Sequence, residues 1–261
     1  MLDQQFNRIV ADSGLTLVGG GGIRELAHSV LHSPPDPRTN ALDQEGRSMF
    51  RDREDAAQQL AAAMRDSKLN NPLILAIPRG GVVTGAVLAR ELGGDLDVVL
   101  SRKLRAPSQP ELAIGAISED GQVHLNRRAV EALGVTDEYL QQERQHQLSE
   151  IARRKRLFRS VRPEARVSGR TVIVTDDGIA TGSTMMAAMQ TVRAQRPAQL
   201  IVAVPVAPLD RLPSFKACCD QFVCLYSPAE FWAVGQFYDA FPTIEDDQVL
   251  DILRNFAPQT A

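Results

Sequence analysis

Two adjacent carboxylates followed by a loop of glycines and hydroxyl groups make residues 171–184 the segment best suited to chemistry. Asp176 and Asp177 come directly after an apolar, β-branched run, and residues with helical spacing begin at Met185. This order predicts a buried strand, a loop of phosphate size and the start of a helix. Glycines let backbone N–H groups face an anion, and the helix end adds partial positive charge. The segment therefore predicts a phosphate site.

The two acids need a different ligand, because their charge repels a phosphate. They suit a sugar diol or a magnesium ion, held directly or through water. An ordinary strand-to-helix turn with an aspartate N-cap is the alternative, but a cap explains one acid and not two acids with three hydroxyls. We therefore expect a phosphorylated sugar to bind at Asp176, Asp177, Gly178, Ile179, Ala180, Thr181, Gly182, Ser183 and Thr184.

Two further predicted strands end in groups suited to anions. One is followed by Arg79, Gly80 and Gly81, and the next by Arg102 and Lys103. Glycines let the backbone approach an anion closely, and adjacent cations after a buried strand are costly without an anionic partner. Solvent-facing charges at a strand edge remain an alternative for the cation pair. The glycine spacing does not fit G-x-G-x-x-G and no Gly-Lys-Ser/Thr occurs, which disfavours an oxidoreductase of the Rossmann type and a P-loop.

The sequence DDGIATGST at residues 176–184 resembles the motif with which type I phosphoribosyltransferases bind 5-phosphoribosyl 1-diphosphate (PRPP). The resemblance covers about residues 50–240. It implies transfer of the phosphoribosyl group from Mg-PRPP to a nitrogen acceptor, a nucleobase, with release of pyrophosphate. Asp176 and Asp177 would hold the ribose hydroxyls and Mg²⁺, directly or through water, and the loop after them the 5-phosphate.

The resemblance also implies roles for the other strand ends. Arg79, Gly80 and Gly81 correspond to a pyrophosphate loop that often contains a non-proline cis peptide, and Arg102 and Lys103 to a basic pair that binds the diphosphate. Asp176, Asp177, Arg102 and Lys103 are the expected catalytic residues. Residues 104–121 correspond to the family's flexible loop, although a plain hairpin fits them equally well. A homodimer is the family-like expectation.

The acceptor is not specified by any motif. Aromatic residues after residue 225 could form a hood with a stacking face for a base, with Trp232 and Tyr238 as candidates, or could fill the core. A basic run at residues 153–166 keeps a second function open, that of a PRPP-sensing regulator which binds nucleic acid or a protein. A solvated helix face or a subunit contact would equally explain this run.

Composition limits the classes of protein. The 261 residues are 44% hydrophobic and 23% charged, with a net charge of -3, so nothing global indicates nucleic acid or a membrane surface. Three cysteines and no secretory signal predict a cytoplasmic protein, and no apolar run reaches the roughly 20 residues of a membrane helix.

The predicted elements give one α/β domain. Strands at residues 73–77, 96–101, 171–175, 200–206 and 221–225 alternate with helices, which predicts a parallel twisted sheet flanked by helices. Residues 102–111 are expected to be a loop, followed by a hairpin at residues 112–125. Residues 1–48, rich in glycine and proline, are predicted to be a mostly disordered extension, and residues 49–261 the phosphoribosyltransferase-like domain.

Overall fold

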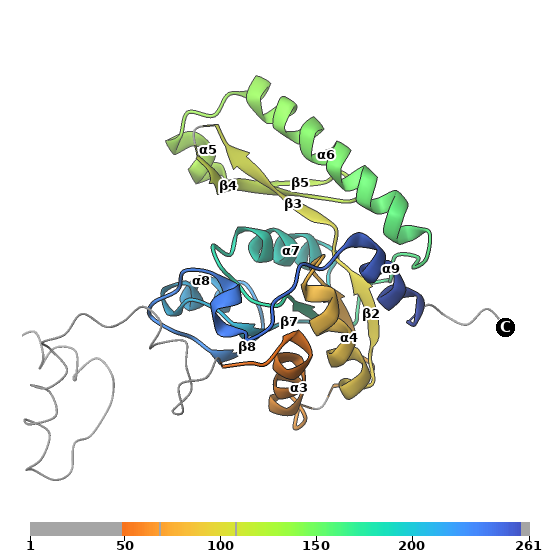
Figure 1. Ribbon diagram of the computed structural model, residues 1–261. Helices are drawn as coiled ribbons and strands as arrows, with labels where there is room; N and C mark the ends of the chain where they lie inside the picture. Colours follow the sequence, from red (N-terminus) through yellow and green to blue (C-terminus); the bar gives the residue numbers. More distant parts are fainter. Residues whose placement is uncertain (1–48, 68, 108, 257–261) are drawn as a thin grey trace, which may run out of the picture. The chain divides into compact units, whose positions relative to one another are not determined.

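The structure is a computed structural model that describes residues 49–67, 69–107 and 109–256 (Figure 1). The predicted disorder of residues 1–48 lies outside the described residues. No helix in the described part of the chain combines the length and the apolar character needed to cross a membrane.

A five-stranded parallel sheet forms the centre of the domain. Its strands, in the spatial order β2-β1-β6-β7-β8, are β2 (Asp95–Val98), β1 (Leu73–Ala76), β6 (Thr171–Thr175), β7 (Gln199–Val206) and β8 (Gln221–Tyr226). Every neighbouring pair is parallel. The predicted parallel α/β sheet is confirmed, and its loops after β1 and β6 meet at one edge because carboxyl ends of parallel strands lie together.

Helices cover both faces of this sheet, because alternate residues of each strand point to opposite sides. Ile74 and Ile173 pack in one cluster with α3 (Arg53–Ala63), α4 (Gly81–Leu92) and α9 (Asp246–Arg254). Leu75 and Val174 pack in another with α7 (Ser183–Ala194) and α8 (Leu212–Lys216). Short 3₁₀ turns lie at Leu209–Arg211 and Val234–Phe237. The apolar strands predicted from the sequence are therefore buried on both sides.

An insertion between β2 and β6 forms a second layer (Figure 1). It contains β3 (Ser101–Ala106), β4 (Gln109–Ser118), β5 (Val123–Leu125), α5 (Arg127–Ala132) and α6 (Asp137–Arg159), and its strands pair antiparallel in the order β3-β4-β5. The predicted hairpin at β4 and β5 is confirmed. The predicted loop at residues 102–111 is wrong, because Leu104 and Ala106 point inward from a strand whose other residues are polar.

The core of the insertion continues into that of the sheet. Leu104, Ile151 and Phe158 belong to the same buried cluster as Leu60 and Ile74. α6 packs on β3 and β4, and α7 packs on the same two strands. The insertion is therefore fixed over the carboxyl edge of the sheet by a shared apolar core.

Candidate functional site

The loop between β6 and α7 forms a cavity of about 180 Å³, here called the loop pocket. It is lined by Asp176, Gly178, Ile179, Ala180, Thr181, Gly182, Thr184, Met185 and Val234. Gly182 has a φ of +81°, and a Cβ there would lie 2.4 Å from the Phe215 ring, so only glycine fits. No side chain caps α7, and the first N–H groups of a helix have no partner within it. The loop can therefore offer amides and hydroxyls to an anion.

The two adjacent acids have different partners. Asp177 accepts a 2.7 Å hydrogen bond from Nε of Arg53, whose Nη1 donates to the carbonyl oxygen of Pro242, also at 2.7 Å. Asp176 lines the loop pocket and accepts from the backbone N–H of Asp177 at 2.9 Å. Burial and the neighbouring carboxylate of Asp177 raise the pKa of Asp176 well above its usual value. Of the pair, Asp176 is the acid that a ligand in the loop pocket can reach.

The loop after β1 packs directly on these acids. The peptide bond between Pro78 and Arg79 is cis, as expected of this loop from the resemblance. A Cβ on Gly80 would lie 1.9 Å from Oδ2 of Asp177, so a side chain there would displace the acid. Nη1 of Arg79 forms a 2.9 Å ion pair with Glu245, next to the start of α9. The loop after β1 and the loop after β6 are thus in direct contact.

The basic residues of β3 are held by α6. Nε of Arg102 donates to Oε1 of Gln147 at 2.8 Å, and Nε2 of Gln147 donates to Glu143 at 2.9 Å. Glu143 also accepts two hydrogen bonds from the guanidinium of Arg105, at 2.8 and 2.9 Å. Burial alone would raise the pKa of Glu143, but the hydrogen bonds from Arg105 lower it below its usual value. Buried groups of α6 therefore position both guanidinium groups.

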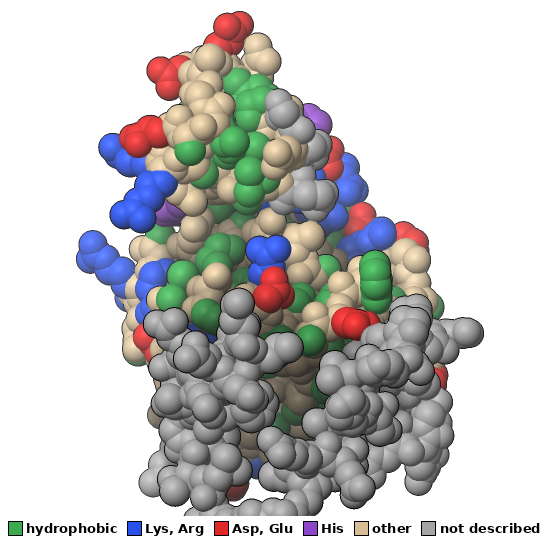
Figure 2. All heavy atoms as spheres, turned by 90° about the vertical axis from the view of Figure 1, so that its left-hand side faces the viewer, with side chains coloured by type: hydrophobic (Ala, Val, Ile, Leu, Met, Phe, Trp, Pro, Cys, Tyr) green, Lys and Arg blue, Asp and Glu red, His purple; other side chains and the backbone are tan. Residues whose placement is uncertain are grey.

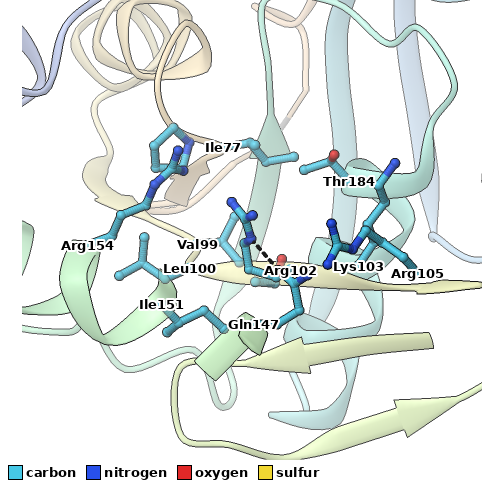
Figure 3. Close-up of a pocket in the computed structure, with 12 residues that line it drawn as sticks. Ile77, Val99, Leu100, Arg102, Lys103, Arg105, Gln147, Ile151, Arg154 and Thr184 are labelled. Carbon is cyan, nitrogen blue, oxygen red and sulfur yellow. Dashed lines mark hydrogen bonds between the residues drawn. The ribbon is translucent and has the colours of Figure 1, made fainter. Parts of the chain in front are cut away.

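A second cavity, of about 250 Å³ and here called the basic pocket, lies between the sheet edge and α6 (Figure 3). Its walls are Ile77, Pro78, Val99, Leu100, Ser101, Arg102, Lys103, Arg105, Gln147, Ile151, Arg154 and Thr184. Thr184 borders both pockets. The structure therefore brings the predicted Arg102 and Lys103 next to the loop after β6, and it adds Arg154, which was not predicted as a site residue.

Of the two expected stacking residues, one is available to a ligand. Trp232 is 75% exposed. Tyr238 is 5% exposed, its ring packs against Phe50 and Phe241 with centroids 5.3 and 4.9 Å apart, and its hydroxyl donates to the carbonyl oxygen of Asp177. An acceptor cannot stack on Tyr238 in this arrangement, because its ring is buried against other aromatic side chains.

The predicted basic run on α6 is divided among different surroundings. Arg153 pairs with Asp246 at 3.2 Å, while Arg159 is bound by Asp97 and Glu119 at 2.6 and 2.9 Å. Arg154 enters the basic pocket. The run therefore does not form the continuous solvated face that nucleic acid would require.

Few side chains of the described residues are suited to bind a metal ion. Among the described residues, no group of three or more His, Cys, Asp or Glu side chains could hold a metal ion, and the three cysteines are free thiols. Asp176 is the one of the two acids that is not paired with Arg53. A magnesium ion fits this site only if most of its ligands are water and substrate oxygens, as is common for this ion.

Comparison with known proteins supplies the family. A model of the phosphoribosyl transferase domain matches residues 47–240. The chain belongs to the phosphoribosyl transferase family. The match includes all three loops described above, so the family's domain and the site coincide.

Relatives of known sequence or structure agree with this assignment. A Mycobacterium tuberculosis protein named as a phosphoribosyl transferase, found in strains H37Rv and CDC 1551, is 40% identical over 213 residues, which are 80% of this chain. The chain spans 48% of the length of that relative. The crystal structure of TT1426 from Thermus thermophilus is 41% identical, covers 80% of this chain and 99% of its own, and superposes with a TM-score of 0.75.

Proposed function

We propose that this phosphoribosyl transferase domain transfers the 5-phosphoribosyl group from PRPP to a nitrogen of a nucleobase and releases pyrophosphate. The observation that carries the proposal is the meeting of two pockets at Thr184, one rich in hydroxyls and amides and the other lined by cations. A phosphorylated sugar with a diphosphate on its other end needs both kinds of pocket side by side.

Each pocket receives one end of the donor. The amides and hydroxyls between Gly178 and Thr184 bind the 5-phosphate, and Asp176 accepts hydrogen bonds from the ribose hydroxyls. Arg102, Lys103 and the amides at Gly80 and Gly81 bind the diphosphate. As the bond from C1 of ribose to the diphosphate breaks, fixed positive groups stabilise the charge that develops on the leaving group. A bond from C1 to the acceptor nitrogen forms, and that nitrogen gives up a proton to solvent.

Magnesium belongs to this proposal as the partner of the diphosphate. When bound, it supplies positive charge to the leaving oxygens. Asp176 would hold it through a water molecule, while Asp177 keeps Arg53 in place. Arg79, already paired with Glu245, would exchange that partner for a phosphate oxygen when the donor enters.

The acceptor and the assembly are the least specified parts of the proposal. Trp232 offers an exposed ring as a stacking face for a base. A homodimer is supported by exposed hydrophobic side chains on the insertion, where Leu112, Leu125 and Leu133 are each at least 40% exposed. Figure 2 shows hydrophobic groups in its upper part, which is the insertion, bordered by charged side chains. Exposed apolar patches of this kind mark protein contacts.

The deciding experiment measures pyrophosphate release from Mg-PRPP in the presence of a panel of purine and pyrimidine bases. We expect release that depends on one base, and a fall of roughly 100-fold in turnover for Asp176→Asn, because a group that orients the ribose is lost. Asp251→Asn removes an exposed carboxylate from α9 and serves as the matched control. Absence of base-dependent release across the panel, or equal turnover in Asp176→Asn and the control, would contradict the proposal.

A further inference from the structure

Arg154 lies on the buried face of α6. The buried residues of this helix are Glu143, Gln147, Ile151 and Phe158. Position 154 follows Ile151 by three residues and precedes Phe158 by four, which is the spacing of one helix face. Arg153 and Arg156 are exposed, whereas Arg154 and Lys155 are half-buried. Lys155 reaches Glu119 at 3.7 Å, and Arg154 lines the basic pocket. The guanidinium group of Arg154 is therefore directed into the protein and not into solvent.

The surroundings of Arg154 compensate only part of its charge. Its Nε is buried without a hydrogen-bond partner among the described residues. Burial and the nearby charge of Arg102 lower the pKa of Arg154. Asp246 offsets part of this repulsion, but its ion pair is formed with Arg153. A half-buried cation beside other cations is costly unless an anion joins it.

The basic pocket provides the space for that anion. Arg102, Lys103 and Arg154 line it, and no carboxylate is among its lining residues in the described part of the chain. Figure 3 shows Arg102 rising from β3 and Arg154 from α6 toward the space near Ile77, with Nε of Arg102 engaged by Gln147. The hydrogen bond from Nε to Gln147 fixes the orientation of the Arg102 guanidinium group and leaves its two terminal nitrogens for a ligand. Two guanidinium groups, one from β3 and one from α6, therefore line the same cavity.

We propose that Arg154 is a diphosphate-binding residue, which acts with Arg102 as a two-sided clamp in the basic pocket. Each guanidinium can bind two phosphate oxygens at once, which is the geometry that selects a diphosphate over a single charge. The identity of this diphosphate as the leaving group of PRPP rests on the proposed function. The clamp deepens that function, because it assigns to helix α6, and not to β3 alone, a direct part in binding the donor.

Calorimetry with inorganic pyrophosphate in magnesium-containing buffer tests the clamp. Arg154→Gln should weaken pyrophosphate binding by about tenfold or more, since a charged hydrogen-bond donor is lost. The affinity for ribose 5-phosphate, which lacks the diphosphate, should stay unchanged. Arg153→Gln removes the same charge from the exposed neighbour on the same helix and should leave both affinities unchanged.

The outcomes separate the clamp from its alternatives. Equal losses of pyrophosphate affinity in Arg154→Gln and Arg153→Gln would overturn it, as would an equal loss for ribose 5-phosphate or a native chain that does not bind pyrophosphate. If Arg154→Gln fails to fold, Arg154→Lys keeps the charge but not the fork, and a pyrophosphate affinity equal to that of the native chain would overturn the clamp. Tight binding that depends on Arg154, without transfer to any base, would support the clamp and refute the proposed reaction.

Discussion

The carboxylate of Asp177 is committed to an ion pair with Arg53, whereas that of Asp176 faces the loop pocket. Arg53 is 7% exposed and its guanidinium also lies over the Phe241 ring, 3.7 Å from the centroid. The same pair fixes the position of Gly80, which has no room for a side chain beside Asp177. Asp177 therefore stabilises the meeting of the loops, and Asp176 is left for the ligand.

Asp177→Asn should be much less stable than the native chain. The substitution leaves the charge of Arg53 buried without its partner, and removing one member of a buried ion pair costs about 3–5 kcal/mol. Asp176→Asn should not lower stability in the same way, because burial and Asp177 already disfavour the charge of Asp176. Urea denaturation of both variants at neutral pH measures the two free energies of unfolding. Equal losses would show that the acids are not divided between these roles.

At the scale of elements, a buried charge network ties the insertion to the edge of the sheet. Arg159 at the end of α6 binds Asp97 of β2 and Glu119 of the turn between β4 and β5. Lys155 also reaches Glu119, at 3.7 Å. Glu164, shortly after α6, lies beside the same carboxylate: burial and Glu119 raise the pKa of Glu164 to about 7. The guanidinium group of Arg159 thus joins α6, β2 and the turn between β4 and β5. Among the described residues, the cluster holds three acids, Asp97, Glu119 and Glu164, but only two cations, Arg159 and Lys155.

This excess acid predicts a pH dependence of stability. A carboxyl group whose pKa is raised by folding binds its proton more tightly in the folded state, so its contribution is greatest at low pH. The free energy of unfolding should therefore fall as pH rises from the ordinary value of 4.5 to about 7. The fall should be modest, because Glu164 as a residue is exposed to solvent.

The glutamine side chain of Glu164→Gln does not titrate, so this variant should lose this part of the dependence of the unfolding free energy on pH. Urea denaturation between pH 4.5 and about pH 7 compares the native chain with Glu164→Gln. Glu150→Gln, which removes a carboxyl group from α6 itself, is the control. The same slope in native chain and Glu164→Gln would contradict the assignment.

The parts of the site that could be predicted are those written in consecutive residues. Asp176 to Thr184 form one loop, and Arg102 and Lys103 follow a predicted strand, so local order was enough. Arg53 could not be found, because its partner lies 124 residues away. Arg154 was hidden for a different reason. Basic residues at four consecutive positions, 153–156, place a charge on every side of a helix, and Arg154 and Lys155 have equivalent spacings from Ile151 and Phe158. Which of the two lines the basic pocket is decided by the tertiary structure.

The fold shows the same limit. Continuous apolar runs identified the buried parallel strands, but β3 has only Leu104 and Ala106 on its inner face. Its pairing with β4 and its cover by α6 decide its conformation, and neither is visible locally. Tyr238 and Trp232 have similar sequence surroundings, yet one ring is in the core and the other in solvent. Packing between segments that are distant in the sequence decides both that β3 is a strand and that Tyr238, but not Trp232, is buried.

At the scale of the whole molecule, charge is unevenly distributed. The chain has a net charge of -3, which alone would repel a diphosphate. Its cations Arg102, Lys103 and Arg154 nevertheless share one pocket that no carboxylate lines in the described part of the chain. The attraction for a diphosphate must therefore be local, because the negative net charge of the whole molecule opposes it.

Salt should weaken this attraction strongly. Between about 0.05 M and about 0.5 M NaCl the screening length falls below the distance across a small site, so pyrophosphate affinity should drop by roughly tenfold. Calorimetric titrations along this range give the slope of log Kd against log salt. If Arg154 is one of the cations that bind the diphosphate, Arg154→Gln should have a shallower slope than the native chain, whereas Arg153→Gln should keep the native slope because its guanidinium is turned to Asp246 and solvent. Equal slopes in the native chain and Arg154→Gln would contradict a contribution of Arg154 to the attraction of the diphosphate.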